Sequence, residues 1–369
     1  MNGEVIFFRL TDVGRSIDLN RAKKIFPGIP DKRIVKTKDT PYNINITETL
    51  KLELTQNISS ESKFINKIDL QIRLYEGGVI SLIARVKFEN IELEKLHNLR
   101  KTTFSTDEGE FKVNQFLKFH FNKVFNQIKT CIEEQDFLFK TNIHEKYTLY
   151  CIIDHIENPK SFVELNKNYL ANLLMGEKPD LNLNMHQIEY TLSQPFSFLE
   201  TDISIFDFDR GLIFDPNRDY EDILLVVEIS NYQLLELRAL DYLLDKRLAI
   251  VEEDIRKIYF KSRTLGRRLN RKIGNLLRLR YDLTFVLENI ANVSKFIGDY
   301  FLAQIYKYLA QLFELSQWSE SIRQRLETFG DIYNVAQTNT NERFLLYVEI
   351  LLSFIFIMEF VFLILDFFR

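Results

Sequence analysis

The sequence predicts an α+β protein: an N-terminal α+β domain, ferredoxin-like or similar, then long coiled-coil helices and one transmembrane helix. Three observations predict this class. Strand-like and helix-like apolar patterns alternate over residues 1–156, apolar residues step by three and four from Asn231 onward, and Phe344–Leu365 is an almost unbroken apolar run. We therefore expect an α+β soluble domain over 1–230 with a candidate sub-boundary near 157. A helical coiled-coil stalk over 231–340 and a C-terminal transmembrane helix over 341–369 would follow it.

Composition supports a globular body with long elements. The 369 residues are 27% charged and 46% hydrophobic, and the low counts of Gly (12) and Pro (7) favour uninterrupted helices. A net charge of −4 gives no overall reason to expect nucleic-acid binding. The two cysteines, Cys131 and Cys151, form no disulfide framework, and the N-terminal residues resemble neither a signal nor a transit peptide. We expect the soluble part in the cytosol.

The first domain is predicted element by element. Glycines at 77 and 78 separate two strand-like runs, which indicates a hairpin, and period-2 alternation of leucines at 50, 52 and 54 indicates a half-buried strand. The expected elements are a strand at Glu4–Leu10, a helix opening near Ser16 and Asp18, the hairpin of Ile65–Tyr75 with Val79–Phe88, a helix at Asp107–Glu134, a strand at Tyr147–Ile156, a small hairpin of Ile203–Phe208 with Gly211–Phe214, and a buried strand at Ile223–Ile229.

The C-terminal third is predicted to be helical. Leu276, Leu279, Leu283, Val286, Ile290, Val293 and Ile297 repeat strictly in steps of three and four, the heptad pattern of helices that pack along one another. A further helix is expected over about 300–337, with a break near Gly330, and Thr338–Asn341 would lead into the membrane run.

The apolar run contains two acids. About 20 residues of helix cross the roughly 30 Å hydrocarbon layer, and only Glu349, Ser353 and Glu359 interrupt the run. Burying a carboxylate in a bilayer costs several kcal/mol, so such groups are usually paired, protonated or protein-facing. We favour helix–helix contact in an oligomer or with a partner membrane protein. One interfacial acid with one protonated acid, and an ion-conducting role, are the alternatives.

A basic stretch precedes the heptads. Its candidate residues for contact with anions, lipid headgroups or RNA are Arg263, Arg267, Arg268, Arg271 and Lys272. The competing interpretation is a solvated face, or one paired with the acids between 202 and 222.

No catalytic motif stands out, so we expect no enzyme activity, no cofactor and no metal. Asp207 and Asp209 could ligate a hard cation, but a lone D-x-D is unspecific. Asp154 and His155 are adjacent in a predicted strand, which points their side chains to opposite faces.

Two glutamates lie ten residues apart in Val348-Glu349-Ile350 and Met358-Glu359-Phe360, with Leu279–Leu283 and Gly298–Phe301 upstream. On these motifs, residues 230–369 resemble a family of uncharacterised membrane-anchored proteins related to a protein required for meiotic nuclear division. The family's proline is replaced by Gly298 and its tryptophan by Ile350. The resemblance implies a single C-terminal transmembrane helix after coiled-coil helices, self-association and no established enzymatic activity.

Together these features predict a membrane-anchored, oligomeric interaction or scaffold protein. The expected location is the cell (cytoplasmic) membrane, single-pass with a cytosolic N-terminus, because Arg343 and the basic stretch precede the span and only Arg369 follows it. The alternative is a component of a divalent-cation transport system of the CorA type, although its second span and Gly-Met-Asn loop are missing.

Overall fold

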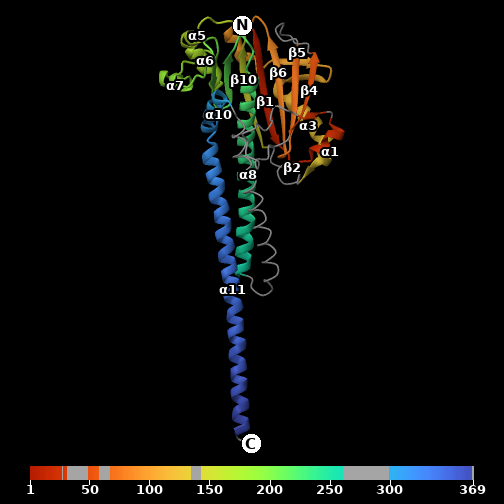
Figure 1. The fold of residues 1–369 in the computed structure, drawn as a ribbon, viewed down its shortest axis with the longest axis vertical. Helices are drawn as coiled ribbons and strands as arrows, with labels where there is room; N and C mark the ends of the chain where they lie inside the picture. Colours follow the sequence, from red (N-terminus) through yellow and green to blue (C-terminus); the bar gives the residue numbers. More distant parts are fainter. Residues whose placement is uncertain (27, 31–48, 58–66, 134–142, 261–298, 368–369) are drawn as a thin grey trace. The chain divides into compact units, whose positions relative to one another are not determined.

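The computed structural model describes residues 1–26, 28–30, 49–57, 67–133, 143–260 and 299–367 (Figure 1). The chain divides into two units. The first comprises Met1–Ala239 with Glu288–Trp318, and the second comprises Leu240–Leu287 with Ser319–Arg369. The first unit combines one large sheet with helices, which confirms the predicted α+β class.

The first unit is built on an eight-stranded sheet. Its strand order is β11-β12-β10-β1-β6-β5-β4-β3, and the neighbouring strands are antiparallel except β10 and β12, which are parallel. The strands are β1 (Gly3–Asp12), β3 (Ile29–Pro30), β4 (Thr49–Asn57), β5 (Lys67–Tyr75), β6 (Val79–Phe88), β10 (His144–Ile152), β11 (Ile203–Phe206) and β12 (Arg210–Phe214).

The centre of this sheet has ferredoxin-like connectivity. The neighbouring strands β10-β1-β6-β5 are antiparallel, with helix α1 (Leu19–Ile25) between β1 and β5 in the chain and α3 (Val113–Ile128) between β6 and β10. Strands β4 and β3 extend the sheet at one edge, and β12 and β11 extend it at the other.

Shorter elements complete the described part of the first unit. They are β2 (Ser16–Ile17) paired with β9 (Ile132–Glu133), β7 (Thr103–Thr106) paired with β8 (Gly109–Lys112), the 3₁₀ turns η1 (Leu93–Lys95) and η2 (Lys129–Cys131), and helices α2 (Leu96–Leu99), α5 (Pro159–Leu165), α6 (Lys167–Met175) and α7 (Met185–Thr191).

The two faces of the sheet differ in chemistry because side chains alternate along each strand. One face carries Val5 and Phe7 and forms a single apolar core with buried residues of α1, α3 and α6. The other face carries Glu4 and Asp12 beside Ile6, and charged side chains there contact helix α8 (Glu221–Phe260).

The N-terminal part of α8 lies on this second face. Tyr232 of α8 stacks on Tyr75 of β5 with ring centroids 4.8 Å apart. Helix α10 (Tyr300–Leu312) lies beside α8, since the Tyr306 hydroxyl donates to the Gln233 side chain at 2.6 Å. The sheet is therefore covered by helices on both faces.

Most predicted elements of the sheet are confirmed. The first strand, the strand at Leu50–Leu54 and the hairpin around Gly77 and Gly78 appear as β1, β4 and β5–β6, and the small hairpin appears as β11–β12. The predicted helix near Asp18 is α1, and the Asp18 carboxylate caps it by accepting from Arg21 N–H at 3.0 Å.

Three predictions about elements were wrong. The run Ile223–Ile229 is not a strand but belongs to α8. The prediction failed because a short, continuous apolar run has no periodicity that distinguishes a buried strand from a buried helix. The helix predicted from Asp107 starts only at Val113, after β8. The C-terminal break lies at Glu314, not near Gly330, and Thr338–Asn341 continues helix α11 (Leu315–Phe367) without interruption.

The second unit consists, in the described residues, of the remainder of α8 and most of α11. Arg325 of α11 forms ion pairs with Asp245 and, at 3.1 Å, with Asp241 of α8. The heptad run from Leu276 to Ile297 lies outside the described residues, so the coiled coil stays a prediction.

Candidate functional site

One segment of α11 is long and apolar enough to span a membrane. This apolar segment, Leu345–Ile364, has a mean hydropathy of 2.3 over 20 residues, and none of it is buried. Its large side chains are exposed, for example Phe354 at 63% and Phe362 at 64%. Exposed apolar surface of this extent marks a contact with membrane or protein.

The predicted contact residues lie on one continuous helix within this segment. Glu349, Ser353 and Glu359 all belong to α11 and are exposed. At about 100° and 1.5 Å per residue, Glu349 and Ser353 share a face, while Glu359 lies about 15 Å further along and about 80° around the helix. Within the described part of the chain, neither glutamate has an ion-pair partner. Their role in helix–helix contact stays a prediction.

The other sequence candidates divide into two groups. Arg263, Arg267, Arg268, Arg271 and Lys272 lie outside the described residues. Asp207 and Asp209 lie in the turn between β11 and β12, where the Asp207 carboxylate accepts from Phe208 N–H at 2.8 Å. The described residues contain no group of three or more His, Cys, Asp or Glu side chains that could hold a metal. The CorA-type alternative rests on the sequence alone.

Asp154 has a structural role instead of the acid–base role considered from its neighbour His155. Its carboxylate accepts from the backbone N–H and from the side-chain amide of Asn2, both at 2.8 Å. These bonds fix the start of β1 beside the end of β10.

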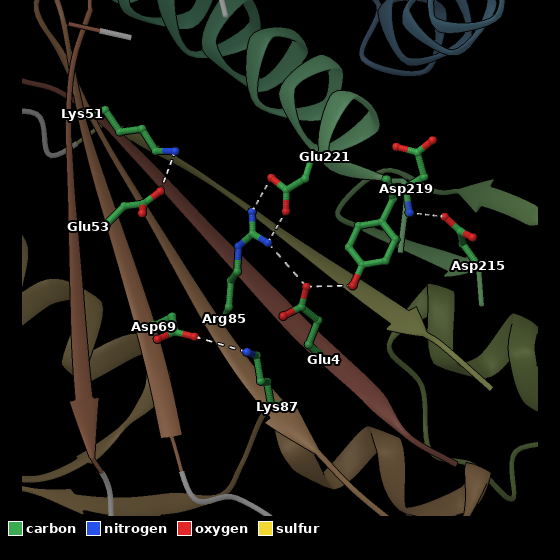
Figure 2. A network of polar contacts seen from close by, with 10 residues as sticks. Glu4, Lys51, Glu53, Asp69, Arg85, Lys87, Asp215, Asp219 and Glu221 are labelled. Carbon is green, nitrogen blue, oxygen red and sulfur yellow. Dashed lines mark hydrogen bonds and ion pairs between the residues drawn. The ribbon is translucent and has the colours of Figure 1, made fainter. Parts of the chain in front are cut away.

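A charged cluster that sequence reasoning missed surrounds Arg85 of β6. Figure 2 shows its guanidinium between two carboxylates, Glu221 at the first turn of α8 and Glu4 of β1. Arg85 Nη2 donates to Glu221 Oε2 at 2.8 Å, and Arg85 Nη1 lies 3.5 Å from Glu4 Oε1. The Tyr220 hydroxyl donates to the same Glu4 oxygen at 2.8 Å. This cluster joins the sheet to the start of α8.

Two open depressions meet at this cluster, with volumes of about 520 and 460 Å³. Both are lined by Asp69, Arg85 and Glu221. The cations beside them are paired, since Lys87 lies 3.7 Å from Asp69 and Lys67 lies 3.2 Å from it. Because the charges satisfy one another, the geometry indicates a structural ion-pair network that fastens α8.

Further along α8, polar residues continue to face the sheet. Glu228 forms an ion pair with Arg73 of β5, and both side chains are almost fully buried. Arg238 forms an ion pair with Glu145 of β10. We call this row of contacts between α8 and the sheet, from Glu221 to Arg238, the polar seam.

The polar seam also contains two buried carboxyls, Asp12 and Glu236. Burial raises the pKa of Asp12 to about 7, although a hydrogen bond from Gly14 N–H opposes the shift. Burial also raises the pKa of Glu236, and the neighbouring Asp12 carboxyl raises it further.

Comparison with known proteins identifies the first unit. Residues 2–221, more than half of the chain, match the family described as "Uncharacterized protein MJ0711, N-terminal domain". The chain belongs to this family. It is also 26% identical over 298 residues to the uncharacterized protein MJ0711 of Methanocaldococcus jannaschii, which covers 80% of each chain. No solved structure matches it.

The MJ0711 N-terminal domain ends where α8 begins. It contains Asp12, Arg73 and Arg85, whereas Glu228 and Glu236 follow it. The polar seam therefore joins the MJ0711 domain to the helix that leaves it. The comparisons give no link to proteins required for meiotic nuclear division, so that resemblance remains an expectation from the sequence.

The sequence of the MJ0711 domain contains a partial signal for the polar seam. Asp69, Gln71 and Arg73 alternate with apolar residues along β5, and Arg85 and Lys87 do so along β6. This alternation marks one polar face on the sheet. It does not show that a helix covers that face.

Proposed function

We propose that this chain is a membrane-anchored, oligomeric interaction protein whose α+β unit is held at the membrane by helix α11. The observation that carries the proposal is the apolar segment Leu345–Ile364, which exposes all of its side chains. Removing a large apolar side chain from water is worth about 1.5–3 kcal/mol, so such a segment requires an apolar environment. Its 20 residues give about 30 Å of helix, the thickness of the hydrocarbon layer.

The two acids of the apolar segment favour oligomerisation. A carboxyl group inside a bilayer needs a hydrogen-bonding partner, and an identical helix from a second copy supplies carboxyls and a hydroxyl at the same depth. Glu349 and Ser353 share a face of the helix, so both could form hydrogen bonds to the second copy at such a contact. A homo-oligomer meets this requirement without another protein, and a partner membrane protein is the alternative.

The resemblance of residues 230–369 to the meiotic-division-related proteins supports the same proposal, because it implies a single C-terminal transmembrane helix after coiled-coil helices. Arg343 before the segment favours a cytosolic N-terminus at the cell membrane. In this arrangement the MJ0711 domain faces the cytosol and offers the surface that partners contact.

Membrane fractionation tests the anchor. The full chain should sediment with membranes and resist extraction at alkaline pH, whereas a chain ending at residue 340 should be soluble. Protease added to sealed right-side-out vesicles should leave the MJ0711 domain intact. Extraction of the full chain by alkali would contradict the anchor, and digestion of the domain would contradict its cytosolic orientation.

Cross-linking in mild detergent tests the oligomer. The double variant Glu349→Leu/Glu359→Leu should lower the cross-linked fraction several-fold. Phe354→Leu is the matched control, because Phe354 lies about 140° around the helix from both glutamates and the change keeps the segment apolar. A wild-type chain that stays monomeric, or equal losses in the variant and the control, would contradict a contact through these acids.

A further inference from the structure

Cationic side chains gather on the core face of the sheet, which is the face that carries Val5 and Phe7, where β1 ends and β10 begins. Arg9 of β1 points to this face, because side chains two residues apart on a strand share a direction. Arg9 pairs directly with Lys146 of β10 across the antiparallel ladder. Directly opposite side chains have Cβ atoms about 4.5–5.5 Å apart, so strand register alone makes these two cations neighbours.

A third cation lies one strand further along on the core face. Arg210 of β12 pairs with Thr148, which is the next residue of β10 after Lys146 that points to this face. Asp209 Oδ1 lies 3.6 Å from Arg210 Nε, so the charge of Arg210 is neutralised in part. We call Arg9, Lys146 and Arg210 the cationic cluster. Arg9 and Lys146 form its centre, and Arg210 borders it.

The centre of the cationic cluster is closed on one side and open to solvent on the other. Arg9 is 8% exposed, whereas Lys146 is exposed. The Nε atom of Arg9 and the hydroxyl of Thr11, the next residue of β1 on this face, are buried and have no hydrogen-bond partner among the described residues. Burial lowers the pKa of Lys146, and the charges of Arg9 and Arg100 lower it further. Unbonded buried donors and adjacent like charges both cost free energy, which an anion bound between them would recover.

We propose that the cationic cluster binds a phosphate group. A guanidinium presents its N–H donors as a rigid fork that matches phosphate oxygens, and a lysine supplies a mobile point charge. Arg9 and Lys146 provide one of each, and Thr11 adds a hydroxyl donor. The exposed Lys146 marks the side from which the phosphate enters. All of these residues belong to the first unit, so the proposal is independent of the membrane anchor.

The phosphate belongs either to a small soluble molecule or to a lipid headgroup, and thermal unfolding of the full chain in a phosphate-free mild detergent separates the two. Inorganic phosphate and dihexanoyl phosphatidic acid are the probes, and sodium acetate at equal ionic strength is the reference. About 10 mM of the bound probe should raise the melting temperature by at least about 2 °C over acetate. A response to inorganic phosphate supports a soluble ligand, and a response to the lipid alone supports a headgroup. No response to either probe, or an equal response to acetate, would overturn the proposal.

Lys146→Gln distinguishes a ligand-binding cation from a structural one. The loss of one charge-assisted contact should weaken binding of the active probe about tenfold. Without ligand, the variant should melt at a slightly higher temperature than the wild type, because the repulsion between Lys146 and Arg9 is gone. Unchanged affinity, or a lower melting temperature of the ligand-free variant, would overturn the proposal.

Lys87→Gln is the matched control. Lys87 is an exposed lysine of β6 on the opposite face of the sheet, where it pairs with Glu4 of β1 in the ladder and lies 3.7 Å from Asp69. This variant should respond to the active probe as the wild type does. An equal loss of affinity in Lys87→Gln and Lys146→Gln would mean that the anion responds to overall charge, and the proposal of a site at the cationic cluster would fail.

Discussion

The guanidinium of Arg73 on β5 forms an ion pair with the carboxylate of Glu228 on α8, and the two side chains are 2% and 1% exposed. The two residues lie 155 positions apart in the chain. An ion pair this deeply buried specifies which part of α8 lies on which strand, because a shift of the helix would leave a charge unpaired.

Removing one partner of this pair should be far more damaging than removing both. Arg73→Met should lower the free energy of unfolding by about 3–5 kcal/mol, since it leaves Glu228 buried and charged. The double variant Arg73→Met/Glu228→Leu should recover most of that loss. Urea denaturation of both single variants and the double variant measures the coupling, and additive losses would show that the two charges act independently.

Arg85 should contribute more to stability than its neighbour Lys87, although both lie on β6 and face the same side. Arg85→Leu leaves the buried Glu4 without its cation and should cost about 1–3 kcal/mol. Lys87→Leu removes only an exposed pair with Asp69 and should change stability by less than about 0.5 kcal/mol. Equal midpoints for the two variants in urea would refute a special role for Arg85.

The β5–β6 turn should not tolerate a side chain at Gly77. A Cβ atom there would collide with the Tyr232 hydroxyl, so Gly77→Ala should cost about 1–3 kcal/mol. Adding Tyr232→Phe removes the colliding atom and should restore much of the loss, which thermal unfolding can measure. If Tyr232→Phe brings no recovery, the helix does not lie against the turn as described.

Both cysteines should be unreactive in the folded protein. Cys151 and Cys131 are 0% and 2% exposed, and burial raises the pKa of the Cys151 thiol well above its usual value. Since the thiolate is the reactive form, neither should be alkylated at pH 8 without denaturant, and both should react in urea. Mass spectrometry of iodoacetamide-treated protein checks this, and labelling of Cys151 in the native state would contradict it.

Replacing Glu314 by glycine should stabilise the protein. It joins α10 to α11 with φ = 54°, a left-handed conformation that costs a residue with a side chain roughly 1 kcal/mol. Glu314→Gly should therefore raise the melting temperature slightly, whereas Glu314→Val should lower it. The opposite order would mean that the Glu314 side chain itself stabilises this junction.

The elements with local signals were predictable from the sequence. The two glycines at 77 and 78 indicated the β5–β6 hairpin, and the alternation of apolar with polar residues indicated β4. The N-capping residue Asp18 indicated the start of α1. The run Ile223–Ile229 was wrongly predicted as a strand because β-branched residues favour strands. It is helical as part of α8, which packs against the sheet. The break at Glu314 carries no glycine or proline, so no local signal revealed it.

By itself, the sequence determined the α+β class, most of the strands and an apolar C-terminal segment, because length, period and composition encode these locally. Only the tertiary structure decided which residues meet. Arg73 and Glu228 are ordinary charged residues in the sequence, and they become a buried ion pair because α8 packs against β5. Long-range contacts of this kind depend on how whole elements pack, which no local pattern records.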